Sequence, residues 1–190
     1  MRSPRVGRGH GRDQVQRDRA AAGCSAVGHV DIWVNNAVRG IGIRVMDCTE
    51  DLDEMLAVNL KSAWYGMKAI IPHFQARRQG HLINISSVLS RVPLVTSRSA
   101  YSASKAALNA LTANLRMDLR SGYPNIHVSL ILPGPVSTEF HNNALGGTST
   151  GRGMELQSVE EVVRTIEAVI ERPAGDVYTN PSSAALVQRY

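Results

Sequence analysis

Apolar and polar positions follow two alternating periods from about residue 30 onward. Short apolar runs predict buried strands over 30–35, 81–86 and 126–132, and a short last strand over 176–179. Between them, apolar residues at steps of three and four predict helices over 52–74, 101–121 and 159–170. Strands that alternate with helices in this order are typical of an α/β fold in which helices cover a parallel sheet.

The expected helix ends are marked by local signals. Gly80 stands where the first helix would be capped, and Gly122 closes the second. Ser158 and Glu161 have the spacing of a capping box at the start of the third helix. Apolar residues of the second helix form one stripe, which consists of Leu108, Leu111, Leu115 and Leu119. The segment 141–153 is rich in Gly, Thr and Asn and is expected to be a loop.

Residues 1–28 show neither period, so we expect a basic, poorly ordered arm there and one domain over 29–190. The first 20 residues hold six Arg against two Asp, and they carry most of the formal net charge of +5. Such an arm is able to neutralise phosphates, but it lacks the interleaved aromatic residues of single-strand binders. Nucleic-acid binding is therefore not expected.

The composition excludes several other classes of protein. The 190 residues are 43% hydrophobic and 19% charged, and they contain no apolar run long enough for a membrane span. The amino terminus has no apolar leader, so we expect a cytoplasmic protein. Cys24 and Cys48 form neither a CxxC pair nor a disulfide framework, and the six His show no ligand spacing. No metal site is expected.

The strongest chemical signal is the pair Tyr101 and Lys105. Residues four apart on a helix project from the same face. An ammonium near a phenol favours the phenolate and lowers the tyrosine pKa, as an acid/base at cellular pH requires. Alone the pattern is weak, but Ser86 and Ser87 end a predicted strand upstream. Ligands of open α/β sheets bind beyond the carboxyl ends of strands, where a serine hydroxyl is able to hold a substrate oxygen.

These features occur within a longer set of motifs. The set comprises NNAV at 35–38, VNLKSAWYGMKAIIPHF at 58–74, INISS at 83–87, YSASK at 101–105 and LPGPVSTEF at 132–140. In order and spacing the chain resembles the short-chain dehydrogenase/reductase family over about residues 30–180. The resemblance implies a Rossmann-like parallel sheet flanked by helices, and an NAD- or NADP-dependent oxidoreductase that acts on a small carbonyl compound or secondary alcohol. It also implies a homo-oligomer, a dimer or a tetramer, built by the two long helices.

The resemblance implies four catalytic positions. Tyr101 matches the acid/base that exchanges a proton with the substrate oxygen, and Lys105 matches the residue that lowers the tyrosine pKa and binds the nicotinamide ribose. Ser87 matches the residue that polarises the substrate oxygen, with Ser86 as its competitor. Asn59 matches the residue that holds a water molecule of the proton relay, and a polar residue within an apolar helix suits a local kink.

The resemblance also implies cofactor contacts. Pro133, Gly134, Val136 and Thr138 match the PGxVxT segment that holds the nicotinamide carboxamide. Asn35, Asn36 and Ala37 match the NNAG element beside the adenosine half of the cofactor, with Val38 in place of the glycine.

The family's first signature is not found in the sequence. Its TGxxxGxG turn follows the first strand and binds the pyrophosphate at a helix N-terminus. Only 34 residues precede Asn35, where two βα units are expected. We therefore expect a truncated or mis-started member that lacks the first β-α units, with the strand at 30–35 as an exposed edge. The alternative to an active enzyme is a catalytically inactive member that acts as an oligomerisation or interaction partner.

Overall fold

A four-stranded parallel sheet forms the centre of the computed structural model, which describes residues 28–40, 42–47, 51–138 and 156–190. The strands are β1 (Ile32–Asn35), β2 (Gly80–Ile85), β3 (Ile126–Leu132) and β4 (Asp176–Tyr178), in the spatial order β1-β2-β3-β4. All three neighbouring pairs are parallel. The α/β fold class and the four expected strands are confirmed.

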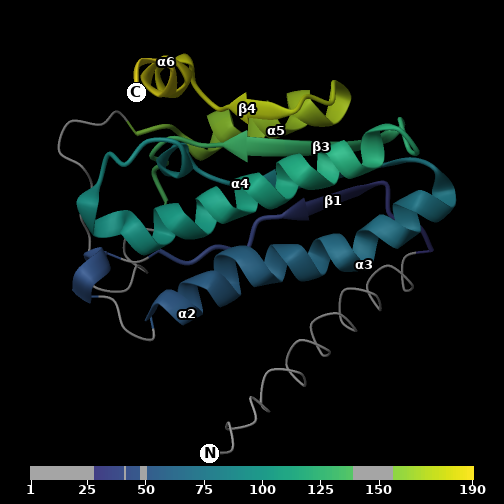
Figure 1. The fold of residues 1–190 in the computed structure, drawn as a ribbon. Coiled ribbons are helices and arrows are strands. Elements are labelled where there is room, and N and C mark those ends of the chain that lie inside the picture. The colour runs from purple at the N-terminus through teal and green to yellow at the C-terminus, as the bar shows by residue number, and fades with distance from the viewer. Residues whose placement is uncertain (1–27, 41, 48–50, 139–155) are drawn as a thin grey trace, which may run out of the picture.

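Helices cover both faces of this sheet. Helices α3 (Ser62–Arg77) and α4 (Ser99–Arg120) run along one side, and α5 (Val159–Glu171) lies on the other (Figure 1). Helix α2 (Asp51–Leu56) precedes α3, and α6 (Pro181–Arg189) follows β4. Short 3-10 turns are η1 (Val45–Asp47), η3 (Val88–Ser90) and η4 (Thr96–Arg98). Helix α6 was not predicted; Asn180 caps its N-terminus, with Pro181 in the first turn.

Alternate residues of the strands supply the two cores. Leu82 and Val128 face α3 and α4, where they pack with Phe74, Ile70 and Leu108. The strand residues that point to the opposite face, including Ile83 and Ile131, pack against Val169 of α5. Burial of both faces explains why these strands read as continuous apolar runs.

The first predicted helix is interrupted, and its end differs from the prediction. Residues Ala57–Lys61 form a π-helical turn, η2, between α2 and α3, which confirms the expected kink at Asn59. Gly80 was predicted to cap the helix, and this is wrong. Arg78 takes the left-handed cap conformation with φ 56°, and Gly80 is the first residue of β2. The close approach of the Phe74 ring to Gly80 leaves no room for a Cβ atom there. The Ser158–Glu161 capping box of α5 is confirmed.

Strand β1 lies at one edge of the sheet that the described residues form. It pairs with β2, and its side chains Ile32 and Val34 are 39% and 42% exposed. The predicted arm, the segment 141–153, Cys24 and Cys48 fall outside the described residues. Within the described part of the chain, none of the helices is long and apolar enough to cross a bilayer.

A buried histidine lies at the opposite end of the sheet from the strands' carboxyl ends. The His81 Nε2 lies 2.8 Å from the Ser129 hydroxyl oxygen, and that hydroxyl donates to the carbonyl oxygen of Ala174. Because the hydroxyl has one proton, it accepts from the Nε2–H of a neutral imidazole. Burial, with a smaller contribution from nearby His127, lowers the pKa of His81 to about 4.

This histidine predicts a loss of stability in mild acid. The unfolded chain binds the proton near the ordinary pKa of 6.5, before the native state does, so stability is complete above that pH and falls as the pH drops toward 4. We expect the free energy of unfolding in urea to fall by about 2 kcal/mol between pH 7 and pH 5. His81→Gln should remove most of this slope, whereas His127→Gln, at an exposed position, should keep most of it. Equal slopes for His81→Gln and the natural chain would contradict the assignment.

Candidate active site

The predicted catalytic and cofactor residues gather at the carboxyl ends of the strands. Asn35 ends β1, Ser87 follows β2, and Pro133 follows β3, so all three lie at the carboxyl ends of parallel strands. Tyr101 and Lys105 lie in the first two turns of α4, which starts beside these strand ends. The topology therefore brings together segments that are up to about 100 residues apart in the sequence.

Ser87 is the serine that faces Tyr101. The two side chains are hydrogen-bonded, and the Ser87 hydroxyl also accepts the backbone N–H of Leu89 at 3.2 Å. The competing Ser86 points elsewhere, and its hydroxyl donates to Asn109 on α4. Of the two serines, only Ser87 is therefore placed beside the tyrosine.

The pKa of Tyr101 is governed by burial and by two neighbours. The side chain is 7% exposed, and burial raises the pKa of its phenol, while the Ser87 hydrogen bond and the positive charge of Arg98 lower it. Arg98 is itself 3% exposed and ends η4, one turn before the tyrosine. Our reading of the sequence missed this arginine. Its spacing of three residues from Tyr101 was the available signal, because such a pair shares a helix face.

Lys105 follows the tyrosine by one turn of α4 and has a buried ammonium. Its Nζ donates to the carbonyl oxygen of Ile85 at 2.8 Å, and burial lowers the pKa of Lys105 to about 8. An ammonium has three N–H donors, and one of them has a hydrogen-bond partner among the residues that the structure describes. This donor set fits a ligand that presents hydroxyl oxygens, such as a nucleotide ribose. The predicted effect of Lys105 on the tyrosine pKa stays a prediction.

Asn59 is fully engaged within the π-helical turn. Its side-chain oxygen accepts the N–H of Arg39 at 2.7 Å, and its amide donates to the carbonyl oxygen of Arg39 and to the Ser104 hydroxyl, both at 3.0 Å. The Ser104 hydroxyl in turn donates to the carbonyl oxygen of Tyr101. The side chain of Asn59 thus joins the segment after β1 to the first turn of α4.

The first three residues of the NNAV element differ in their surroundings. Asn35 donates to Asn84 on β2 at 2.8 Å and to the carbonyl oxygen of Ala63 on α3 at 3.3 Å. These two hydrogen bonds fasten β1 to β2 and α3. Asn36 and Ala37 are exposed.

The segment from Pro133 to Thr138 leaves β3 and is held by Gln157, which was not predicted. The buried amide of Gln157 accepts the N–H of Gly134 at 3.3 Å and donates to the carbonyl oxygen of Thr179 at 3.1 Å. Val136 forms a backbone bridge with Gln157. The carbonyl oxygen of Pro133 accepts the N–H of Val88, so this segment contacts the serine turn directly. Thr138 lies exposed at the end of the described stretch.

No cluster of three or more metal-ligating side chains occurs among the residues that the structure describes. The chemically reactive side chains that the structure brings together here are Tyr101, Ser87, Lys105 and Arg98.

Comparisons with known proteins agree with this arrangement. The family model for short chain dehydrogenases matches residues 11–147, a range that begins within the predicted arm. An uncharacterised oxidoreductase of Staphylococcus epidermidis is 34% identical over 140 residues, which are 72% of this chain and 57% of that protein. The chain spans about half the length of the curated relatives it matches.

Solved structures show the same fold. A short chain dehydrogenase from Burkholderia cenocepacia in complex with NADP superposes with a TM-score of 0.77 at 27% identity, over 90% of this chain and 70% of that one. A short chain dehydrogenase/reductase from Burkholderia phymatum in complex with NAD superposes with a TM-score of 0.79 at 24% identity, over 93% and 70%. At 24% identity, the likeness to the Burkholderia phymatum protein shows the fold alone.

Arg98 gives a prediction for the ionisation of Tyr101. Removal of its charge by Arg98→Gln should raise the pKa of Tyr101 further, because a nearby cation favours the phenolate. The measurement is an alkaline titration of tyrosinate absorbance, with Tyr101 isolated by subtracting the curve of the same protein carrying Tyr101→Phe. Arg120→Gln, an exposed change at the other end of α4, serves as the control. An unchanged Tyr101 curve in Arg98→Gln would refute the role of this charge.

Proposed function

The chain belongs to the short-chain dehydrogenase family, and on that premise we propose that it is an NAD(P)-dependent oxidoreductase that interconverts a carbonyl group and a secondary alcohol. The observation that carries this proposal is the hydrogen bond between Ser87 and Tyr101, with the buried Lys105 one turn further along α4. This arrangement offers two hydroxyl groups to one substrate oxygen. Because the chain spans about half the length of its curated relatives, the activity of the whole protein is part of the proposal.

In this mechanism the bound nicotinamide supplies or accepts the hydride. The Ser87 hydroxyl donates to the substrate oxygen and orients it toward Tyr101. The Tyr101 phenol gives its proton to that oxygen in reduction and takes it back in oxidation. Arg98 stabilises the phenolate that reduction leaves behind, and Lys105 adds a second positive charge from the same helix face.

The residues that would hold the cofactor lie on the nicotinamide side. Lys105 would donate to the ribose hydroxyls with N–H groups that have no partner among the described residues, and the Pro133–Thr138 segment would hold the carboxamide. Asn35, Asn36 and Ala37 would stand beside the adenosine half. The cofactor would be NAD or NADP. The solved relatives named above contain one or the other.

The proposed Asn59 relay rests on its place in the π-helical turn. Asn59 lies in η2, and the side chain of Asn59 is hydrogen-bonded to Arg39 and Ser104. A π-turn loosens the usual i→i−4 bonding, which leaves backbone carbonyls able to accept from water. We therefore propose that the backbone of this turn, rather than the Asn59 amide, holds the relay water.

The proposed homo-oligomer would use α3 and α4. Both helices carry an exposed apolar side chain, Trp64 at 37% and Met117 at 73%. Self-association through these helices stays a prediction.

Cofactor binding and Tyr101→Phe test the proposed function. We expect the purified chain to bind NADH or NADPH saturably, as followed by nicotinamide fluorescence. Tyr101→Phe should lower kcat for carbonyl reduction at least about 100-fold, because it removes the transferred proton, and should leave the cofactor Kd unchanged. Tyr190→Phe, at a tyrosine that is 79% exposed, is the matched control.

Two results would count against the proposal. A folded chain that binds neither dinucleotide would favour the alternative of an inactive interaction partner. Turnover that survives Tyr101→Phe would show that another group moves the proton.

A further inference from the structure

A buried side-chain amide of α4 contacts the serine turn beyond β2 at two points. Asn109 is 6% exposed, its side-chain oxygen accepts from the Ser86 hydroxyl, and its Nδ2 donates to the Ser90 hydroxyl at 2.7 Å. Ser86 and Ser90 flank Ser87 on either side. The pattern that identifies the family does not single out this asparagine, and the mechanism above does not use it.

The direction of these hydrogen bonds is determined by the number of protons available. The Ser90 hydroxyl has one proton, which it donates to the carbonyl oxygen of Ser87. Ser90 must therefore act as an acceptor toward its other neighbours. The Nδ2–H of Asn109 donates to it at 2.7 Å, and the Ser86 hydroxyl oxygen lies farther away, at 3.3 Å. The Asn109 oxygen is then free to receive the proton of Ser86. An asparagine amide, with a donor and an acceptor side by side, satisfies both serines.

Ser87 depends on this arrangement through three contacts. Its carbonyl oxygen accepts from the Ser90 hydroxyl and from the Ser90 backbone N–H, and its own hydroxyl accepts the N–H of Leu89 at 3.2 Å. These contacts define the short turn that points the Ser87 hydroxyl at Tyr101. Loss of the Asn109 donor lets the Ser90 hydroxyl turn away from the Ser87 carbonyl.

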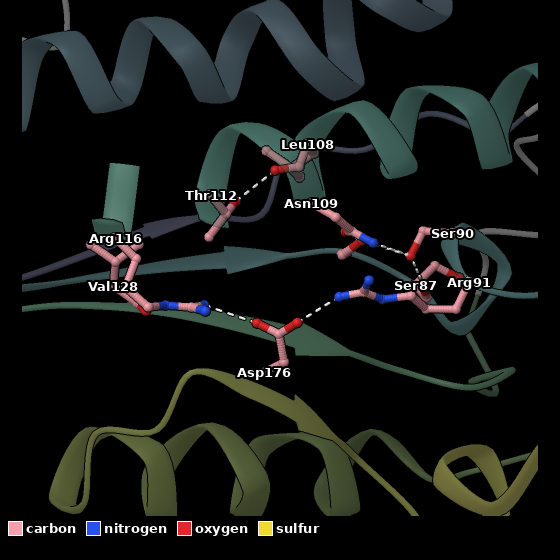
Figure 2. A network of polar contacts seen from close by, with 10 residues as sticks. Ser87, Ser90, Arg91, Leu108, Asn109, Thr112, Arg116, Val128 and Asp176 are labelled. Atoms are coloured by element: carbon pink, nitrogen blue, oxygen red, sulfur yellow. Dashed lines mark hydrogen bonds and ion pairs between the residues drawn. The ribbon is translucent and has the colours of Figure 1, made fainter. Parts of the chain in front are cut away.

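The far side of the turn is held from the same helix. Arg91 follows Ser90 and donates to the Asp176 carboxylate, whose other oxygen accepts from Arg116 of α4 at 2.9 Å (Figure 2). Arg116 is anchored in turn, because its Nε donates to the carbonyl oxygen of Val128 at 2.8 Å. The turn is thus fastened on both sides to one rigid element.

Because Asn109 and Tyr101 lie on the same helix, helix geometry sets the distance between the serine turn and the tyrosine. Tyr101, Lys105 and Asn109 follow one another at intervals of four residues, so they share a face of α4 over about 12 Å. The helix that carries the acid/base thereby also carries the residue that orients the serine turn. We propose that Asn109 is a positioning residue of the active site, which holds the Ser86–Ser90 turn so that the Ser87 hydroxyl faces Tyr101. The proposal rests on the proposed function for its catalytic meaning.

The test uses the full chain without cofactor, so it does not depend on turnover. Asn109→Leu removes both hydrogen bonds at nearly constant volume, and Asn114→Leu makes the same change at an exposed position of α4. We expect the amides of Leu89 and Ser90 to exchange hydrogen at least about tenfold faster in Asn109→Leu, because the turn has lost its anchor. Exchange in β3 should stay unchanged, and so should exchange of the turn in Asn114→Leu.

A second readout separates positioning from a merely structural role. In the tyrosinate titration, Asn109→Leu should raise the pKa of Tyr101 as much as Ser87→Ala does, and the double variant should raise it no further. An unchanged Tyr101 curve, or effects of the two changes that add, would overturn the proposal. If Asn109→Leu does not fold, Ser90→Ala removes the relaying hydroxyl and should give the same two results.

The failure of this proposal is distinguishable from failure of the proposed function. A chain that binds neither NADH nor NADPH refutes the enzyme assignment and leaves both measurements on the serine turn intact. A chain that binds cofactor, but in which Asn109→Leu changes neither the exchange nor the titration, keeps the enzyme assignment and refutes the role of Asn109.

Discussion

The face that α4 turns toward the sheet is partly polar, and this constraint organises the site. Five residues at steps of three and four form a polar stripe along the helix: Tyr101, Lys105, Asn109, Thr112 and Arg116. A buried polar group without a partner costs about 1–3 kcal/mol, so each member needs a partner on a neighbouring segment. Tyr101 pairs with Ser87, and Lys105 pairs with the Ile85 carbonyl. Asn109 pairs with Ser86 and Ser90, and Thr112 pairs with Asn84. Arg116 pairs with the Val128 carbonyl and with Asp176. The placement of α4 over β2 and β3 satisfies them all.

The same stripe makes the geometry of the active site a consequence of folding. The hydrogen bonds that dock α4 on the sheet are the same ones that join Tyr101 to Ser87 and Lys105 to the Ile85 carbonyl. Asn59 and Ser104 add a link from the opposite side, between the π-helical turn and the first turn of α4. Burial raises the pKa of Tyr101 and lowers that of Lys105, so the docking that orders these groups also shifts their ionisation.

Periodicity predicted most of the fold because it reports burial directly. The strands and long helices were found within a few residues, and the spacing of Tyr101 and Lys105 placed both on one helix face. The leucine stripe of α4 was only half informative, since Leu108 and Leu119 are buried while Leu111 and Leu115 are half-buried. Arg98, Asn109 and Gln157 were missed for a physical reason. Their roles are defined by partners from distant segments, and a buried arginine or amide looks like a surface residue until those partners are known.

Polar contacts across the strands also specify the register of the sheet, which apolar packing alone leaves loosely defined. Asn35 and Asn84 are register partners on β1 and β2, and their amides bond directly. Asn84 then donates to Thr112 of α4 at 2.9 Å. A slip of β2 by one residue would turn Asn84 toward α5 and His81 toward α4, which would leave buried polar groups on both faces without partners. Since Ser86 and Ser87 directly follow β2, the register that satisfies Asn84 is also the one that delivers Ser87 to Tyr101.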